Sequence, residues 1–373
     1  MDPCRAHVHD SHYTVKIRPS SGQEGKPRWQ GQSTTSEYCS VGHPDRTCDY
    51  IVAYILDRYL ERDRNARVAL EAQLKDCFCT LSGEVTSAYR YTDAELAEFC
   101  REAIRKIGYT DEYRDRWGEG NVVSGSGVEV TVHISHQSGD IAQGVNRDGW
   151  GDQGIFWGMA VNDPKRGYMP KDYWLAREIA QSLVNRGFDG LDVKTQVTVE
   201  DGLPVECVVA IPILPECEAA ATGTIRNYVQ SILGGDCCVI VNGTGRYVTH
   251  GPIGDCGTTG RKLVADFYGG NSKIGGGSPW GKDPTKADVT LNILARDRAL
   301  KFLRERNRDE VHCAISCCIG RSEIRVSFFD GRGECLESRV ENDPPSHIID
   351  RLGLREPGYA GVCEEGLFGC ETV

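Results

Sequence analysis

The chain has 373 residues, 39% of them hydrophobic and 26% charged, which is typical of a soluble globular protein of two or three domains. Its net charge of −11 argues against a general nucleic-acid binder, because phosphate backbones favour a basic face. No run approaches the roughly 20 apolar residues of a membrane span, and the N-terminus lacks the apolar core of a signal peptide. We therefore expect a cytoplasmic protein with neither nucleic-acid nor membrane partners.

Cysteine is abundant, with 17 residues, but no pair has the spacing of a zinc site. Cys237–Cys238 and Cys317–Cys318 are adjacent pairs inside apolar, strand-like runs. We interpret most of the thiols as small buried hydrophobes in a reducing compartment.

The first half of the chain predicts a flexible lead-in over residues 1–33 and then helices and paired strands. After the Gly-His-Pro-Asp-Arg stretch at 42–46, apolar residues up to Leu60 follow the i, i+3, i+4, i+7 spacing of a helix. Residues 66–86 alternate as two strands. Thr92 and Glu95 form the pattern of a capping box, and Gly108 ends the helix that follows.

The second half repeats this order of elements. The pattern predicts a hairpin over 194–213 with a turn at Asp201–Gly202, helices over 215–233 and 285–306, and strands over 237–248, 311–320 and 322–341. Strands joined by tight turns favour antiparallel or mixed sheets, so the fold class is α+β and not doubly wound. We expect three approximate domains: N-terminal 34–135, central 136–250 and C-terminal 251–373. The central and C-terminal domains together span 136–373, and we expect strands to be exchanged between the domains.

Two glycine-rich stretches, 251–270 and 275–288, combine bendable backbone with acids and cations. The first places Asp255 shortly before Arg261 and Lys262; the second contains Lys282, Asp283, Lys286 and Asp288. Each reads either as a glycine-rich turn with solvated charges or as a backbone that closely approaches a phosphate.

A P-loop is a weaker interpretation of the second stretch. Gly276, Gly281 and Lys282 fit seven positions of that motif, but the eighth is Asp283 where a Ser or Thr should hold magnesium. Pro284 also separates the stretch from the next helix. Lys282 can bind phosphate without that fold.

The stretch at 42–46 also has two interpretations. It is either a helix entry, with Pro44 setting the turn and Asp45 capping, or a site where His43 donates to a developing oxyanion and Asp45 binds magnesium. Over the whole chain the candidate cations are Lys194, Arg261, Lys262, Lys282 and Lys286, and the candidate anions are Asp45, Asp152, Asp255 and Asp288. Five cations suffice for a triphosphate of about four negative charges, and the acids make sense if some hold Mg²⁺.

Taken together, the stretches at 35–46, 151–158, 192–199, 245–270 and 275–288 resemble the S-adenosylmethionine synthetase (methionine adenosyltransferase) family, in the family's order. The resemblance runs from about Thr34 to Gly320. It implies three similar α+β domains around a pseudo-threefold axis, and a homodimer, often paired into tetramers, with active sites at the interface. It also implies a reaction in which methionine sulfur attacks C5′ of ATP, and the displaced tripolyphosphate is hydrolysed to pyrophosphate and phosphate.

The resemblance implies a role for each matching residue. His43 resembles the residue that assists the departing oxygen, Asp45 and Asp288 look like the Mg²⁺ carboxylates, and Glu71 looks like the K⁺ ligand. Lys194, Arg261, Lys262 and Lys282 are similar to the phosphate-binding cations. Glu84, Gln137, Asp255 and Lys286 resemble methionine-pocket residues, with Ile319 as an apolar wall. Asp152 is placed near methionine and the nucleoside, and Asp192, Arg246 and Tyr247 match adenosine contacts.

The chain also departs from the family's pattern. The segment between Gln137 and Asp152 is shorter than the family's gating loop, Arg46 replaces a usual Lys, and residues 1–33 are extra. Trp280 stands where a small hydroxyl residue is expected near potassium, so the K⁺ requirement stays open. Two alternatives remain: a non-catalytic paralogue that binds nucleotide, and an enzyme of the same fold that uses a methionine analogue.

Overall fold

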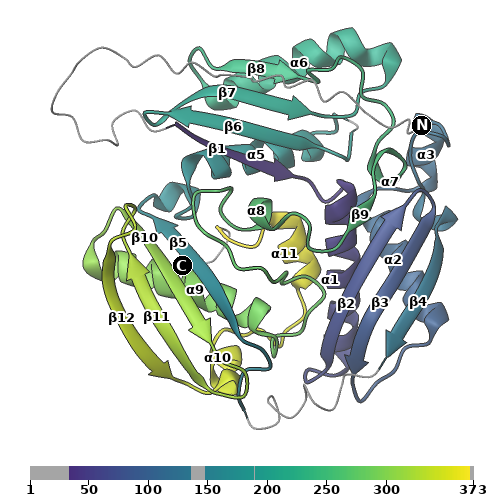
Figure 1. The fold of residues 1–373 in the computed structure, drawn as a ribbon. Coiled ribbons are helices and arrows are strands. Elements are labelled where there is room, and N and C mark those ends of the chain that lie inside the picture. Colours follow the sequence, from purple (N-terminus) through teal and green to yellow (C-terminus); the bar gives the residue numbers. More distant parts are fainter. Residues whose placement is uncertain (1–32, 136–147, 189, 370–373) are drawn as a thin grey trace, which may run out of the picture.

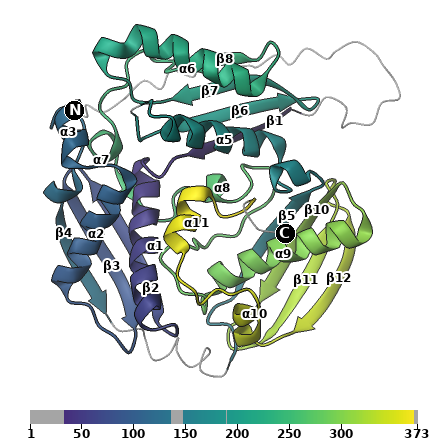
Figure 2. The same ribbon diagram turned by 180° about the vertical axis from the view of Figure 1, so that it is seen from behind.

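The computed structural model describes residues 33–135, 148–188 and 190–369, and every structural statement below concerns these residues. Three four-stranded sheets lie in a ring, with their main helices turned toward its centre (Figures 1 and 2). The α+β class predicted from the sequence is confirmed. The predicted lead-in, 1–33, lies outside the described residues except for Ser33.

The first sheet has the order β4-β3-β2-β9 and is covered on one face by α1 and α2. Its core residues alternate along β2, where Val68, Leu70 and Ala72 are buried against α1. The capping box of Thr92 and Glu95 starts α2 as predicted. The elements are α1 (Pro44–Arg62), β2 (Arg67–Lys75), β3 (Phe78–Thr86), α2 (Asp93–Ile107), β4 (Glu129–Ser135) and β9 (Gly257–Thr258).

The second sheet has the order β1-β6-β7-β8, so the first described strand pairs with a hairpin more than 150 residues further along. The predicted turn is present, with Asp201 and Gly202 at φ of 49° and 78°. The predicted strand 237–248 is too long: it ends at Val241, because Asn242 adopts φ of 47° and its side-chain amide bonds both backbone groups of Ile211. The elements are β1 (Ser33–Cys39), α5 (Lys171–Asn185), β6 (Lys194–Glu200), β7 (Leu203–Ala210), α6 (Glu218–Leu233) and β8 (Cys238–Val241).

The third sheet has the order β12-β11-β10-β5 and packs on α9. The contact is close at Gly158, where an added Cβ would lie 2.1 Å from the Ala295 backbone. The predicted helix over 285–306 begins two residues late, at Ala287. The elements are β5 (Gly154–Val161), α9 (Ala287–Arg306), β10 (Glu310–Cys317), β11 (Glu323–Phe329), β12 (Cys335–Asn342) and α10 (Pro345–Arg351).

Short elements join the sheets. The C-terminal α11 lies against α1, where the Asp57 carboxylate accepts from the backbone N–H groups of Gly358, Tyr359 and Ala360. No helix in the described ranges has both the length and the apolar character that a membrane crossing requires. The short helices are α3 (Asp111–Trp117), α7 (Gly251–Gly254), α8 (Leu263–Asp266) and α11 (Tyr359–Glu365), with 3₁₀ turns at Gly125–Gly127, Pro164–Arg166 and Pro215–Cys217.

Candidate active site

The first turn of α1 carries His43 and Asp45. The His43 side chain caps α1, because its Nδ1 accepts a hydrogen bond from the Asp45 N–H at 3.2 Å. The helix-entry interpretation made Asp45 the cap, and it is wrong on this point. An accepting Nδ1 leaves the proton on Nε2. Burial, followed by the nearby Lys262 charge, lowers the pKa of His43 to about 4. The imidazole is therefore neutral at physiological pH and presents Nε2–H as a donor.

Asp45 is buried and holds the first glycine-rich stretch. Its carboxylate accepts from the Thr258 N–H at 2.9 Å and from Lys262 at 2.5 Å, and Arg261 Nε lies 3.6 Å away. Gly257 allows this approach, because a Cβ there would lie 2.1 Å from the Pro44 carbonyl oxygen. The sequence neighbours Arg261 and Lys262 are thus both directed at one carboxylate.

The two glycine-rich stretches extend the same edge of β2. Residues 257–258 pair with Gln73 and Leu74, while Lys282 bridges Ala69. The stretches also touch, since a Cβ on Gly260 would lie 2.8 Å from the Ser278 side chain. The P-loop interpretation is wrong, because residues 281–283 form this edge contact and do not lead from a strand into a helix.

The second stretch contains two lysine–carboxylate pairs. Lys282 Nζ lies 2.6 Å from Asp288, and Lys286 Nζ lies 2.6 Å from the buried Asp283. Gly277 leaves room for the Asp288 carboxylate, which an added Cβ would overlap. The side chains of Lys282 and Lys286 are 22% and 17% exposed, so each lysine reaches solvent while its ion pair with a carboxylate holds it in place.

Asp192 and Lys194 lie beside this group at the start of β6. Asp192 accepts from the Gly251 N–H at 2.9 Å and from the Tyr247 hydroxyl, yet burial raises its pKa to about 6. Lys194 pairs with Glu37 at 2.8 Å. Asp255 is exposed and accepts from the Cys256 N–H. His43, Lys262, Lys194 and Asp255 are close enough to influence one another electrostatically.

Among the residues that the structure describes, the other predicted site residues form no hydrogen bond or ion pair with this group, although Asp152 and Asp288 both lie close enough to Cys317 to help raise its pKa. Glu71 and Glu84 lie on β2 and β3 and face away from α1; among the described residues neither carboxylate forms a hydrogen bond or ion pair. Arg246 is exposed on the loop after β8. Asp152 and Ile319 flank the end of the sheet where Gly154 pairs with Cys317, and Ile319 is 50% exposed. Gln137 lies outside the described residues.

A group not predicted from the sequence lies beneath the site. Arg46 forms ion pairs with Asp266 and, at 3.3 Å, with Asp49, and its guanidinium lies 5.1 Å from the Trp280 ring centre. The Trp280 indole donates to Asp266 at 2.9 Å, and Asp49 accepts from the Gly260 N–H. Arg46, Asp49, Asp266 and Trp280 are called the buried cluster below. The sequence did contain a signal for this cluster, since positions 46 and 280 both differ from the family's usual residues.

The residues present suit Mg²⁺ better than K⁺. Among the described residues, no three His, Cys, Asp or Glu side chains gather as a complete metal site. Proteins hold Mg²⁺ through one or two carboxylates together with substrate phosphates, and Asp45 and Asp288 carry such oxygens. For K⁺, Trp280 brings no oxygen, and the cation beside it is the Arg46 guanidinium. The described residues therefore do not fit a K⁺ ion at Trp280.

Comparisons with known proteins point to one family. The N-terminal domain model of S-adenosylmethionine synthetase matches residues 32–139, and the C-terminal domain model matches 249–373. The resemblance thus extends to the C-terminus, beyond the predicted limit at Gly320.

Individual relatives agree with the family models. S-adenosylmethionine synthases of Salinibacter ruber and Helicobacter hepaticus are 37% and 34% identical, covering 91% and 90% of this chain and 93% and 92% of theirs. The structure of an unusual S-adenosylmethionine synthetase from Campylobacter jejuni superposes with a TM-score of 0.79 at 27% identity, over 90% of this chain and 94% of that one.

Proposed function

The chain belongs to the S-adenosylmethionine synthetase family and is a methionine adenosyltransferase, and we propose that the residues gathered along the β2 edge stabilise the triphosphate leaving group of ATP. Methionine sulfur attacks C5′, the C5′–O bond breaks, and the electron pair leaves with the tripolyphosphate. Displacement at carbon requires no protein nucleophile, so alignment and charge stabilisation supply the catalysis. Hydrolysis of the bound tripolyphosphate to pyrophosphate and phosphate follows.

The single observation that carries this proposal is the convergence of Lys262, Lys282 and Arg261 from two stretches onto one strand edge. Each close lysine–phosphate pair contributes on the order of 4 kcal/mol at an effective dielectric near 20, before desolvation. Lys194 adds a fourth cation from β6. The neutral His43 donates its Nε2–H to the oxygen that departs from C5′.

Asp45 and Asp288 would hold Mg²⁺, which when bound shares the charge of the phosphates. Both carboxylates are now paired with lysines, at 2.5 and 2.6 Å. Lys262 and Lys282 would turn from these carboxylates toward the phosphate oxygens of bound ATP. The two ion pairs hold Lys262 and Lys282 beside the carboxylates at this edge of the site.

Nucleoside and methionine recognition fall to the remaining residues. Asp192 and Tyr247 form one hydrogen-bonded unit suited to the adenosine, with Arg246 beside it. Asp255, Lys286 and Ile319 suit the methionine, together with Glu84 and Gln137, and Asp152 lies near both substrates. We assign no step to K⁺ at Glu71.

We also propose a homodimer with active sites at its interface, paired into tetramers where the family arrangement holds. Glu71 and Glu84 support it, since they lie on the open face of the first sheet and would serve a site completed by a second chain. The exposed apolar side chains Phe78 and Ile155, at 59% and 58%, lie on the same kind of open face. Such an enzyme would work in the cytoplasm.

The test mixes the purified chain with ATP, methionine and Mg²⁺ and quantifies S-adenosylmethionine, pyrophosphate and phosphate in the same samples. Equal amounts of the three products are expected. Bound nucleotide without a sulfonium product would indicate a silent paralogue. Turnover of other thioethers in preference to methionine would indicate an altered sulfur substrate.

A further inference from the structure

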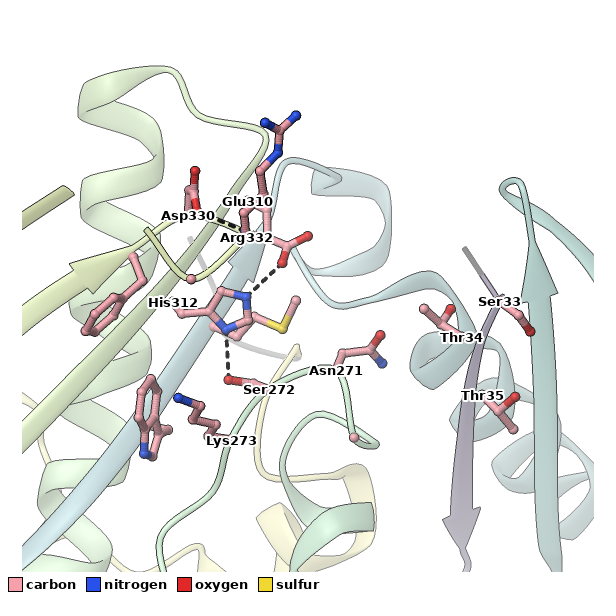
Figure 3. Close-up of a pocket in the computed structure, with 16 residues that line it drawn as sticks. Ser33, Thr34, Thr35, Asn271, Ser272, Lys273, Glu310, His312, Asp330 and Arg332 are labelled. Carbon is pink, nitrogen blue, oxygen red and sulfur yellow. Dashed lines mark hydrogen bonds and ion pairs between the residues drawn. The ribbon is translucent and has the colours of Figure 1, made fainter. Parts of the chain in front are cut away.

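His250 is a buried histidine beside the residues proposed above to bind adenosine. It lies directly before α7, which is next to α3 in both views of the fold (Figures 1 and 2), and it is 1% exposed. His312, by contrast, bonds Ser272 and Glu310 in a cavity of about 760 Å³ at the open face of β5 and β10 (Figure 3), which a second chain of the proposed homodimer would cover. The bonds of His250 lie inside one chain, so they do not depend on that assembly.

The hydrogen bonds of the His250 side chain can run in one direction only. Its Nδ1 lies 2.6 Å from the Val248 carbonyl oxygen, which only accepts, so Nδ1 carries the proton. Burial lowers the pKa of His250 to about 4, so the ring is neutral and Nε2 accepts from the Tyr113 hydroxyl at 2.7 Å. The oxygen of that hydroxyl accepts in turn from the Leu191 N–H at 3.2 Å. These four residues form a continuous chain of hydrogen bonds, which we call the histidine relay.

The histidine relay joins the two segments that make up the proposed adenosine site. One end, Leu191, is the residue before Asp192, and the other end, Val248, is the residue after Tyr247. Asp192 itself accepts from the Gly251 N–H at 2.9 Å and from the Tyr247 hydroxyl. The separation of Asp192 and Tyr247 is therefore fixed twice, once by their own bond and once by the relay behind it.

Aromatic rings from α3 and the end of α2 pack around the relay. The ring centres of Trp117 and Tyr109 lie 4.6 and 6.3 Å from that of His250. The Tyr109 hydroxyl also donates to the Gly42 carbonyl at 2.6 Å, just before the first turn of α1. On its other side it meets Gly251, which has φ of 59° and where an added Cβ would lie 2.5 Å from the hydroxyl oxygen. The same rings therefore support both the adenosine segment and the start of α1.

The backbone at His250 has an anchor that does not involve its side chain. The His250 N–H donates to the Asn121 carbonyl at 3.0 Å, and the Thr249 hydroxyl donates to the Asn121 side chain at 2.8 Å. Loss of the bond between His250 and Tyr113 would therefore leave this segment attached to the chain around Asn121. The segment would then be able to shift relative to Asp192, because the relay no longer ties the two together.

We propose that His250 and Tyr113 are positioning residues that hold the adenosine contacts, Asp192 and Tyr247, at the separation that the nucleoside requires. The inference rests on the proposed function, because it concerns the nucleoside half of that site. Both residues act through Asp192 and Tyr247 and are not catalytic residues. None of the four relay residues is a cation assigned to the triphosphate. The relay therefore sets affinity for the nucleoside and leaves affinity for the phosphates unchanged.

The test measures the binding of two ligands to the full-length chain by calorimetry, with Mg²⁺ held constant. One is adenylyl imidodiphosphate, an analogue of ATP, and the other is inorganic tripolyphosphate, which lacks the nucleoside. Tyr113→Phe removes the hydroxyl and keeps the ring, and should weaken the analogue about tenfold and tripolyphosphate less than about twofold. His250→Asn is too short to reach Tyr113 and should show the same loss. Because both variants break one bond, the double variant should bind no more weakly than either alone.

Steady-state kinetics give a second readout, in which the KM for ATP rises by a similar factor while kcat and the KM for methionine change less than about twofold. Tyr91→Phe is the matched control, because its hydroxyl donates to the Arg58 carbonyl at 2.8 Å, near the far end of α1, and it should bind both ligands as the wild type does. Weakening of both ligands alike in a folded Tyr113→Phe chain, or of neither, overturns the proposal, as do additive losses in the double variant. Since binding is measured without turnover, a chain that binds both ligands but forms no S-adenosylmethionine contradicts the proposed function and not the relay.

Discussion

Asp45 and Arg46 are adjacent on α1, yet they belong to two regions that use the same kinds of charge differently. Asp45 faces the site, where the pairs Lys262–Asp45, Lys282–Asp288 and Lys194–Glu37 include lysines that are 17%, 22% and 43% exposed. We call these pairs the lysine rim. Arg46 points into the buried cluster, where its side chain and that of Asp266 are at most 2% exposed.

This difference in exposure predicts that the buried cluster contributes to stability and the lysine rim to catalysis. The rim lysines reach solvent, and the partly exposed pair Lys194–Glu37 is worth about 1 kcal/mol or less, so these lysines can exchange a carboxylate for phosphate. The buried cluster has no such exchange, and burial raises the pKa of Asp266 against the opposing effect of Arg46. Losing Asp266 leaves the buried Arg46 guanidinium with Asp49 as its one carboxylate partner in the cluster. Variants in the two regions should therefore fail in different assays.

The largest effect is expected from Asp266→Ala. The substitution leaves the Arg46 guanidinium buried without its main partner and removes the acceptor of the Trp280 indole. We expect a loss of about 3–5 kcal/mol in unfolding free energy, measured by urea denaturation. The control is Asp343→Ala, which breaks the more exposed pair with Arg351 and should cost about 1 kcal/mol or less. Equal losses in both variants would remove the distinction between the regions.

Lys282→Met should show the opposite behaviour. Loss of its charge weakens stabilisation of the triphosphate and should reduce turnover at least tenfold, which is about 1.4 kcal/mol of barrier, with unfolding free energy changed by less than about 1 kcal/mol. Lys301→Met is the control, because Lys301 pairs with Asp297 on the exposed side of α9. Unchanged turnover in Lys282→Met would remove this lysine from the mechanism.

The same contrast explains what the sequence could predict. Elements with strong periodicity, such as α2 with its capping box and the hairpin at Asp201–Gly202, follow from local patterns. The candidate rim lysines could be found because cations and glycines cluster within short stretches. Their pairing could not, since Lys262 meets Asp45 across 217 positions and the outcome depends on how the sheets pack.

The features that the sequence analysis misjudged or missed have one local cause and one long-range cause. The strand predicted over 237–248 continued through residues of good strand propensity, but the left-handed backbone and side-chain bonds of Asn242 end it. The buried cluster gave no motif, because Arg46 and Asp266 are 220 positions apart.

A smaller effect tests whether His43 belongs to the lysine rim or is as buried as Arg46. The pKa of His43 is about 4 in the folded chain and 6.5 ordinarily. Between pH 4 and pH 6.5, His43 is therefore protonated in the unfolded chain and neutral in the folded chain. Unfolding free energy should therefore fall as pH falls below 6.5, by about 1 kcal/mol over the first unit. His43→Asn should lack this increment in urea titrations.

Other groups titrate in the same window and remain in both proteins. His250 has its pKa lowered by burial to about 4, and Asp192, raised to about 6, acts in the opposite direction. The informative quantity is thus the difference between wild type and variant. His347→Asn, at a side chain 71% exposed, should keep the wild-type pH dependence. A His43→Asn curve parallel to wild type would mean that His43 is as solvated as the rim lysines.

The smallest effect concerns potassium, at the boundary between the two regions. Because Trp280 offers no oxygen and packs on a guanidinium, a monovalent cation there would meet repulsion without ligands. Replacing K⁺ by tetramethylammonium at constant ionic strength should change turnover less than about twofold, or roughly 0.4 kcal/mol of barrier. The measurement is steady-state formation of S-adenosylmethionine with Mg²⁺ held constant. A tenfold loss without K⁺ would mean that the exposed Glu71 and the lysine rim form a cation site that does not need position 280.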